Sequence, residues 1–482
     1  ASGNGNNPIM HVIDNADTEV AWFEGRRAGD TGAYIAIRHN PSSAAESNRS
    51  GIKFQADDDG GNVTNYAQIT QYISDNTGGT EDGDLAFNQM INGTSTETMR
   101  LKGGTIIVGE NVGNNIGLGV EALDNISSGT ENVGIGKEAL TDVSSGGGNT
   151  AIGNEALANN TADGNVAVGK LSGYTNSSGI GLTALGYEAL RYSTNNHNTG
   201  VGYRVGKDCT GQYNVFMGSG AAQEVTSAEQ NVVIGSNAVG TGVMTGNSNV
   251  LIGYSTGEDT TSGMQNVAVG SGALTANTTS KYITAVGYQA LTTFNITNGG
   301  GGHNTAVGWK AGLDMTTGSG CTLIGSGTGQ NIVTGERNTA VGTAALETLN
   351  SDKSDNNALG YYALQATTGI QNVAMGSYSG ASCTTGDGNI FIGHQAGNSS
   401  STNTGNDNII MGGRWNSQNA GGNLTSGYTN IMIGNAVGAW GVGMTTGYSN
   451  VFIGTAATGS VGSGHDQVTI GYNLQNQNGN NT

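Results

Sequence analysis

Apolar and polar positions alternate within a short unit that recurs along most of the chain. The unit is first clear at residues 132–136 (Asn-Val-Gly-Ile-Gly), and its last copy ends at Gly471. Counting from Gly119, 21 copies close on a glycine, and most closing glycines are 16 to 18 residues apart. This spacing is far below the roughly 30 residues of the shorter helical repeats, so it predicts a β-solenoid or β-roll with one coil per repeat.

Three positions inside the unit predict a short strand. The residue before the glycine is Ile, Val, Leu or Met in all 21 copies, and the residue two places earlier is Val, Ile or Thr except at Asn357. Alternation with period two puts these two on one face, which we expect to point into a core. The position between them is mostly apolar too, as in Phe216 and Leu251. We therefore expect burial of both faces, with the cover supplied by the coil itself or by other copies of the chain.

Asn and Gly mark the corners of the predicted coil. Asn opens the unit in 17 of the 21 copies and Gly closes it, and both residues tolerate a left-handed backbone. Cys321 takes the opening position in one copy, so we interpret it as a buried structural thiol. Three cysteines, at 209, 321 and 383, are too few and too far apart for a disulfide framework or a zinc ribbon.

The first 108 residues do not repeat. Alternating runs at 33–37, 51–56, 66–74, 84–88 and 98–101 predict strands, and residues 105–109 resemble a first coil. The chain is therefore expected to be all-β. We divide it into an N-terminal β-rich attachment module at 1–108, an array of coils at 109–471 and a polar tail at 472–482.

Composition and charge narrow the function classes. The net charge is −19 and the only clustered cations are Arg26-Arg27, which disfavours binding to nucleic acid or to an anionic membrane. No apolar run approaches the ~20 residues that span a bilayer. Only 35% of residues are hydrophobic, which suits the thin core of a solenoid better than a globular core of this length.

Candidate chemistry is sparse. The six histidines are scattered, and no nucleophile elbow, phosphate-binding loop or zinc-protease motif occurs. The acidic run at 57–59, with neighbours near 81–84, is read as a solvated turn rather than a calcium site. Four glutamates share the position two after the closing glycine and predict an exposed acidic edge: Glu121, Glu138, Glu155 and Glu188. We expect no metal, no cofactor and no enzymatic activity.

Aromatic residues recur directly after the closing glycine. Stacked coils would line them along one edge of the rod, where flat rings could dock sugars. The alternative is that they cover the coil corners or pack between chains. The candidates are Tyr187, Tyr203, Tyr254, Tyr288, Trp309, Tyr361 and Tyr472, with His394 at the same place.

Longer intervals between glycines lie toward the end of the array. Extra loop length tolerates variation without disturbing a stacked core. Residues 393–454 contain Trp415 and Trp440 inside such expanded coils. We predict that the receptor-facing surface lies there with both tryptophans as anchors, the alternative being that both fill the enlarged coils as core residues.

The repeats resemble a known class of proteins. The pattern Asn-x-Ala-Val-Gly-x-x-Ala-Leu is similar to units of long phage tail fibres and, more distantly, to coils of trimeric autotransporter adhesin heads. The runs at 52–57, 83–85, 92–94 and 97–101 are similar to a module that precedes such repeats in fibres of marine phages. The resemblance covers residues 50 to 471. It implies a virion appendage that recognises a host surface.

These observations give one expected function and two alternatives. We expect a structural virion fibre, a parallel homotrimer that binds other virion proteins through its N-terminal module and a host-surface glycan or protein along its rod. A polysaccharide-degrading tailspike would need converging acids or a metal, which the regular array does not offer. A bacterial trimeric surface adhesin, located at the cell surface, is the other alternative.

Overall fold

A computed structural model describes residues 49–57, 63–75, 82–91, 94–102, 105–108, 113–349, 352–398, 402–439, 444–459 and 462–474. These residues form strands and turns without a helix, which confirms the predicted all-β class. They belong to two compact units, residues 1–114 and residues 115–482. In the described part of the chain, no helix could cross a membrane.

The N-terminal unit contains a five-stranded antiparallel sheet in chain order. Its strands are β1 (Arg49–Asp57), β2 (Val63–Asp75), β3 (Asp82–Ile91), β4 (Thr94–Lys102) and β5 (Thr105–Val108). The strands predicted at 51–56, 66–74, 84–88 and 98–101 are confirmed as parts of β1 to β4. The strand predicted at 33–37 lies outside the described residues.

The prediction of a first coil at 105–109 is wrong. Residues 105–108 form β5, which pairs antiparallel with β4 in the register Lys102↔Thr105. Two glycines, Gly103 and Gly104, separate the two strands, and a two-residue Gly-Gly connection between strands favours a hairpin over a coil corner. The first strand of the coil ladder is instead at 116–118.

One cross-strand row of this sheet is apolar. A single cross-strand row contains Ile52, Ile69, Phe87, Met99 and Val108, one residue from each strand. Ile52 is 47% exposed, and Phe54 beside it on β1 is 53% exposed. The sheet therefore exposes apolar side chains at its β1 edge.

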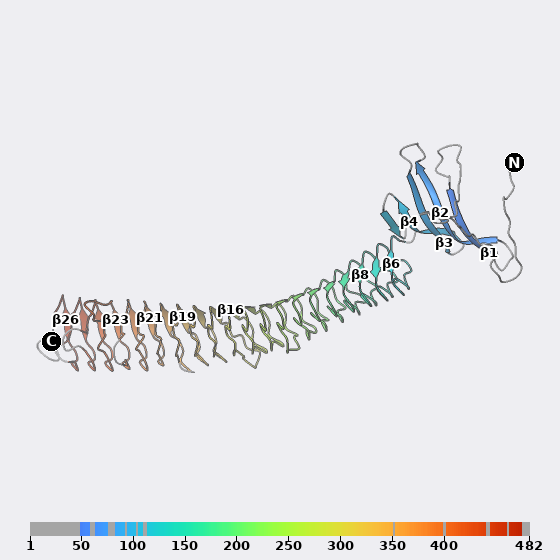
Figure 1. Cartoon of the computed structure of the whole chain (residues 1–482). Helices are drawn as coiled ribbons and strands as arrows, with labels where there is room; N and C mark the ends of the chain where they lie inside the picture. Colours follow the sequence, from blue (N-terminus) through green and yellow to red (C-terminus); the bar gives the residue numbers. More distant parts are fainter. Residues whose placement is uncertain are drawn as a thin grey trace, which may run out of the picture. The chain divides into compact units, whose positions relative to one another are not determined.

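The second unit is a stack of coils that each contribute one three-residue strand to a single parallel ladder (Figure 1). Every strand pairs in register with the preceding and the following one, and β6 and β26 lie at opposite ends of the stack. The predicted solenoid of 21 coils is confirmed. The strands are β6 (Ile116–Leu118), β7 (Val133–Ile135), β8 (Thr150–Ile152), β9 (Val166–Val168), β10 (Thr183–Leu185), β11 (Thr199–Val201), β12 (Val215–Met217), β13 (Val232–Ile234), β14 (Val250–Ile252), β15 (Val267–Val269), β16 (Thr284–Val286), β17 (Thr305–Val307), β18 (Thr322–Ile324), β19 (Thr339–Val341), β20 (Asn357–Leu359), β21 (Val373–Met375), β22 (Ile390–Ile392), β23 (Ile409–Met411), β24 (Ile431–Ile433), β25 (Val451–Ile453) and β26 (Val468–Ile470).

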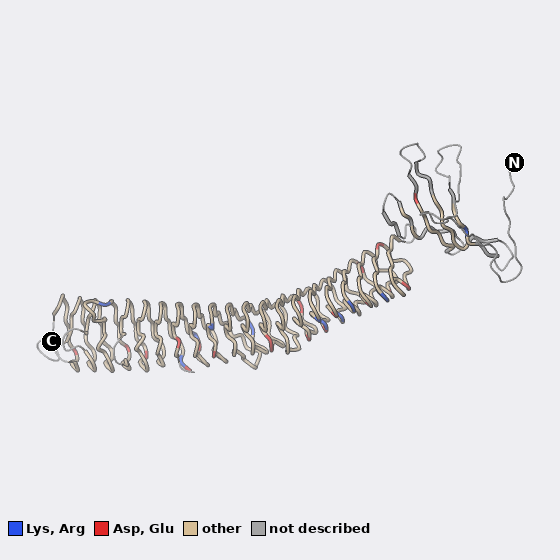
Figure 2. Tube along the Cα trace, in the orientation of Figure 1, with Lys and Arg blue, Asp and Glu red and all other residues tan. Residues whose placement is uncertain are grey.

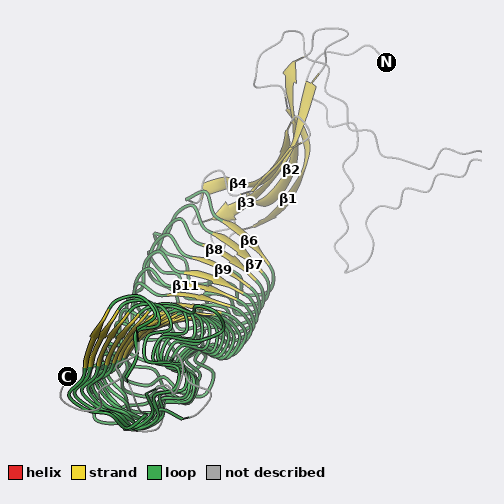
Figure 3. Ribbon diagram, turned by 90° about the vertical axis from the view of Figure 1, so that its left-hand side faces the viewer, coloured by secondary structure: helices red, strands yellow, loops and turns green. Residues whose placement is uncertain are grey.

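The strands occupy one side of the coils and turns form the rest of each coil (Figure 3). The middle residue of each strand points into the coil, and from β7 to β26 it is buried in every strand. The first and third residues point outward and are half-buried or exposed; Met217, for example, is 43% exposed. Our prediction that the first and third positions face the core is therefore wrong. Because apolar residues occupy the middle position of the strand as well as the first and third positions, the period-two alternation does not identify which set points inward.

Matched side-chain sizes fill the narrow interior. Where the middle strand residue is small, as at Ala151, the position four after the closing glycine is often a buried leucine such as Leu157. Where the middle residue is large, that position is often small, as with Gly397 after Phe391 and Ala222 after Phe216. A Cβ on Gly397 would lie 2.2 Å from the Phe391 ring, so the two positions share one volume.

Buried asparagines connect successive coils at the position that opens each unit. The backbone N–H of Asn372 donates to the Asn356 Oδ1 (3.1 Å), and its side-chain Nδ2 donates to the Gly386 carbonyl of the following coil (2.8 Å). Its Oδ1 accepts from the backbone N–H of Asn389 (2.9 Å). The same pattern repeats along much of the rod and satisfies polar groups that no water reaches. This explains why Asn is so frequent there.

Asn372→Ala is expected to destabilise the solenoid by about 2 to 4 kcal/mol. The substitution leaves the Gly386 carbonyl and the Asn389 N–H without their buried partner, and each unsatisfied group costs roughly 1 to 3 kcal/mol. The urea midpoint, read by circular dichroism, measures the loss. Asn154→Ala serves as the control, because the Asn154 amide makes one exposed hydrogen bond to the Lys137 carbonyl. Equal midpoints for the two variants would contradict a structural role for the buried asparagines.

Candidate functional site

The residues that follow the closing glycines lie on one edge of the solenoid, because the strands before them are paired in register. We call this the aromatic edge. Its members are all exposed: Tyr187, Tyr203, Tyr254, Tyr288, Trp309, Tyr361, His394 and Tyr472. Exposure keeps them available for contact. The hypothesis that these rings bind a receptor stays a prediction.

The aromatic edge is interrupted rather than continuous. The rings of Tyr187 and Tyr203 stack on neighbouring coils, with centroids 5.4 Å apart and planes 12° apart. The next two coils carry Ser219 and Ser236 at the same position. The Lys310 ammonium lies 4.5 Å from the centroid of the Trp309 ring, a cation–π distance. The edge therefore consists of separate aromatic groups.

A tyrosine triad on the coils of β20 and β21 was not predicted. Tyr361 on the aromatic edge contacts Tyr362 and Tyr378, with ring centroids 4.2 and 5.3 Å away. Tyr362 and Tyr378 occupy the position two after the glycine on neighbouring coils, where the backbone φ is positive. Hydrogen bonding to Tyr362 and burial raise the pKa of the Tyr361 hydroxyl. The sequence signal was the adjacent Tyr361-Tyr362 pair followed by Tyr378 one repeat later.

Of the two tryptophans predicted as receptor anchors, Trp415 and Trp440, only Trp415 lies within the described residues. Trp415 is half-buried at the surface, in a short turn closed by backbone hydrogen bonds with Gln418 (2.9 and 3.0 Å). Its ring centroid lies 6.0 Å from that of Tyr472, a residue of the aromatic edge three closing glycines further along the chain. Trp415 therefore lies outside the core. Trp440 lies outside the described residues.

The predicted acidic edge divides into two parts. Glu121 is exposed, and Glu138 is half-buried and paired with Lys137 (2.6 Å), whose ammonium lowers the pKa of that carboxyl through a hydrogen bond. Glu188 is instead buried, with 5% of its side chain exposed. The expectation of a solvated carboxylate is therefore wrong at Glu188, because two arginines cover it.

Glu188 is the centre of a cluster of charged and aromatic side chains that was not predicted. Arg191 Nη1 lies 2.6 Å from Glu188 Oε1, and Arg204 Nε lies 2.9 Å from Glu188 Oε2. The carboxylate thus bridges two coils. The signal was a tyrosine directly after the glycine followed by a charged residue, in two successive repeats.

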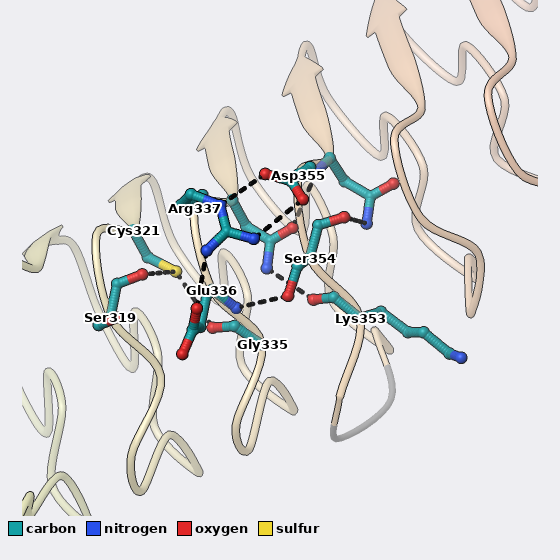
Figure 4. A network of polar contacts seen from close by, with 10 residues as sticks. Ser319, Cys321, Gly335, Glu336, Arg337, Lys353, Ser354 and Asp355 are labelled. Atoms are coloured by element: carbon teal, nitrogen blue, oxygen red, sulfur yellow. Dashed lines mark hydrogen bonds and ion pairs between the residues drawn. The ribbon is translucent and has the colours of Figure 1, made fainter.

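A second arginine network, at coils β18 to β20, is saturated by carboxylates (Figure 4). Arg337 Nε lies 2.7 Å from Asp355 Oδ1, its Nη2 lies 3.1 Å from Asp355 Oδ2, and its Nη1 lies 2.7 Å from Glu336 Oε2. Every nitrogen of this guanidinium has a carboxylate partner. Arg337 therefore ties two coils together, with a carboxylate partner on each of its three nitrogens.

No candidate metal or catalytic centre emerges from the part of the chain that is described. Three or more His, Cys, Asp or Glu side chains do not converge there in a way that could hold a metal ion. The acidic runs at 57–59 and 81–84 lie only partly within the described residues. The expectation that the chain is not an enzyme stays a prediction.

The three cysteines are buried and free, as predicted for Cys321. Burial raises the pKa of the Cys209 and Cys383 thiols to about 12 and that of Cys321 to about 11. All three thiols should therefore be inert to a water-soluble disulfide reagent at pH 8 and react only after denaturation. Thiol titration with and without guanidinium measures this difference in reactivity; prompt reaction of the native protein would contradict the burial of the thiols.

The raised thiol pKa values also predict a pH dependence. Because the folded pKa values exceed the unfolded value of 9.0, the free energy of unfolding should be constant with respect to these thiols below pH 9 and should decline as the pH rises toward 11.

Comparison with known proteins does not assign the chain to a family. No protein-family model, curated protein or solved structure matches the chain.

Proposed function

We propose that the chain is a structural fibre protein of a virion, assembled as a parallel homotrimer, that adheres to a host surface without catalysis. The observation that carries this proposal is the outward face of the parallel ladder, which is open in a single chain and whose third strand position is apolar in every coil. The following paragraphs argue from that face to self-association, attachment and adhesion.

The outward face of the ladder is too apolar to suit a monomer. Its side chains include many that are more than a third exposed: Leu118, Ile152, Val166, Leu185, Val215, Met217, Val267, Ile324, Leu359, Met375, Met411, Ile431, Ile433, Ile453, Val468 and Ile470. With coils about 4.8 Å apart, 21 coils extend for roughly 100 Å, and a strip about 10 Å wide presents on the order of 1,000 Å². Monomeric proteins rarely expose a continuous apolar patch of this size.

The occupant best suited to this face is another copy of the same chain. The apolar side chains of this strip recur once per coil, so a partner must present apolar side chains at the same spacing along the whole strip. An identical ladder in parallel orientation has that spacing at every coil. The area available per chain matches the roughly 800 Å² per partner of a stable interface. The choice of three chains follows the resemblance of the repeats to trimeric fibres and adhesin heads.

The N-terminal sheet suits attachment to other virion proteins. It exposes the apolar side chains of Ile52 and Phe54 on β1, and the coil ladder begins at β6 soon after β5 ends. The rod would then carry the aromatic edge away from the particle, where exposed tyrosines and tryptophans could dock a host-surface glycan or protein.

Purified full-length protein tests the proposal in two steps. Negative-stain electron microscopy should show rods with a straight repetitive portion roughly 100 Å long, and fluorescently labelled rods should bind cells of a susceptible strain but not receptor-deficient mutants of it. A release of reducing ends from surface polysaccharide would instead support a tailspike enzyme. Compact globules, or rods that bind all strains equally, would contradict the fibre proposal.

A further inference from the structure

A cluster on coils β9 to β11 concentrates positive charge in an acidic protein. Over residues 165–210 there are four cations, Lys170, Arg191, Arg204 and Lys207, against two carboxylates, Glu188 and Asp208, in a chain of net charge −19. Several Lys and Arg segments recur on neighbouring coils in the first third of the solenoid (Figure 2). This stretch is therefore a local positive field on a negative rod.

Aromatic rings are interleaved with these cations. The Arg191 guanidinium lies 5.8 Å from the Tyr174 ring centroid and 5.0 Å from that of Tyr192. The Lys207 ammonium lies 5.6 Å from the Tyr192 ring, and the Arg204 guanidinium lies 5.3 Å from the Tyr203 ring. With Tyr187 stacked on Tyr203 and Glu188 bound to both arginines, the contacts form one connected network over three coils.

The internal ion pairs leave cationic donors free. Glu188 is one carboxylate shared by two guanidiniums, and Arg204 uses only Nε for it. The two Nη groups of Arg204 make no hydrogen bond within the described residues, and 38% of its side chain is exposed. Lys207 has only a distant carboxylate, Asp208, at 3.9 Å. Arg337 differs from Arg204, because each of its three guanidinium nitrogens has a carboxylate partner.

We propose that this cluster binds an acidic sugar residue of a surface polysaccharide. The carboxylate or sulfate group of the sugar would accept hydrogen bonds from the free Nη groups of Arg204, with the Lys207 ammonium adding charge. The buried Glu188 holds the Arg204 guanidinium in place, so little side-chain entropy is lost on binding. The exposed rings of Tyr187 and Tyr203 offer apolar surface to the sugar ring.

This inference rests on the proposed adhesive function and specifies its ligand class. Chemistry favours a sugar over a nucleic acid or a membrane because the cationic surface is small and the surrounding rod is acidic. One acidic sugar unit of a polysaccharide is small enough to meet only the cluster, and the exposed rings of Tyr187 and Tyr203 beside it suit a sugar face.

Binding of defined polysaccharides to the full-length protein tests the proposal. Polygalacturonate supplies carboxylates, dextran sulfate supplies sulfates, and dextran is the neutral probe. We expect one or both acidic polymers to bind and dextran not to bind. The double variant Arg204→Gln, Lys207→Gln should weaken binding by about tenfold or more, since charge-assisted hydrogen bonds are lost.

The matched control is Arg337→Gln, Lys353→Gln, which changes net charge by the same amount at a site where every guanidinium nitrogen already has a carboxylate partner. This variant should bind acidic polymers within about twofold of the parent. Lys207→Gln alone provides a version that leaves the Glu188 ion pairs intact, and it should still weaken binding measurably.

Three outcomes would overturn the proposal: no binding of either acidic polymer, equal losses in both double variants, or equally strong binding of vesicles containing anionic lipid. The oligomeric state, measured on the same samples, distinguishes a failure of the acidic-sugar proposal from a failure of the fibre proposal. An intact trimer that ignores acidic sugars rejects only the ligand class.

Discussion

Gly136→Ala is expected to cost about 3 kcal/mol or more of folding free energy, whereas Gly148→Ala should cost about 1 kcal/mol. Gly136 closes a coil at φ 129°, and an added Cβ would lie 2.6 Å from the Gly153 carbonyl oxygen of the next coil. Neighbouring coils approach so closely at this position that a methyl group must push them apart. Gly148 has φ 68° and no atom within 4 Å of an added Cβ, so only the left-handed backbone is strained there.

Comparing Gly136→Ala with Gly148→Ala separates the cost of a steric clash between coils from the cost of a left-handed backbone conformation. Thermal melting followed by circular dichroism, together with hydrogen exchange of the neighbouring coils, measures both substitutions under identical conditions. The equivalent place to Gly148 holds Glu131 and His197 in other coils, which indicates that a side chain is accommodated there. If Gly148→Ala were as damaging as Gly136→Ala, contact between closing glycines would not explain why all 21 units end in glycine.

Met217→Asp combined with Met375→Asp is expected to break self-association. Both methionines are third strand residues on the outward ladder face, 43% and 45% exposed in one chain. In a parallel trimer each substitution brings three carboxylates together at one level of a desolvated interface, which costs several kcal/mol per level. Within a single chain the new aspartates remain at the surface, so coil folding should be nearly unchanged.

The control combines Ile180→Asp with Val243→Asp. These residues are 43% and 49% exposed but lie in turns away from the ladder strands. The added charge and the lost apolar area are therefore similar. Size-exclusion chromatography with light scattering should find the ladder variant shifted to monomer and the control unchanged. The interface assignment would be refuted by a ladder variant that keeps the parent mass.

The sequence predicted the coil, its corners and its strand with accuracy because each depends on a local pattern that recurs. A glycine at a fixed place, such as Gly136, reports a backbone requirement directly. The inward face was predicted wrongly because apolar residues occupy both faces of the strand. A partial signal was present in size pairing, since some large middle residues such as Phe391 accompany glycine four places after the closing glycine, and most small ones, such as Ala151, accompany leucine.

The candidate site was less accessible from sequence. The aromatic edge could be predicted because it repeats at one position, but the cluster around Glu188 depends on side chains that meet across coils. Arg204 reaches a carboxylate 16 residues earlier, and no single repeat contains the pair. Reading charges down columns of aligned coils, rather than along one repeat, would have found it.

The central claim is that the outward apolar face of the ladder is covered by further copies of the chain. Sedimentation equilibrium of the purified protein at micromolar concentration tests it most directly, because the mass does not depend on shape. The account predicts three chains of 48.6 kDa in one particle, about three times the mass of a single chain. A stable species of 48.6 kDa at these concentrations would contradict it.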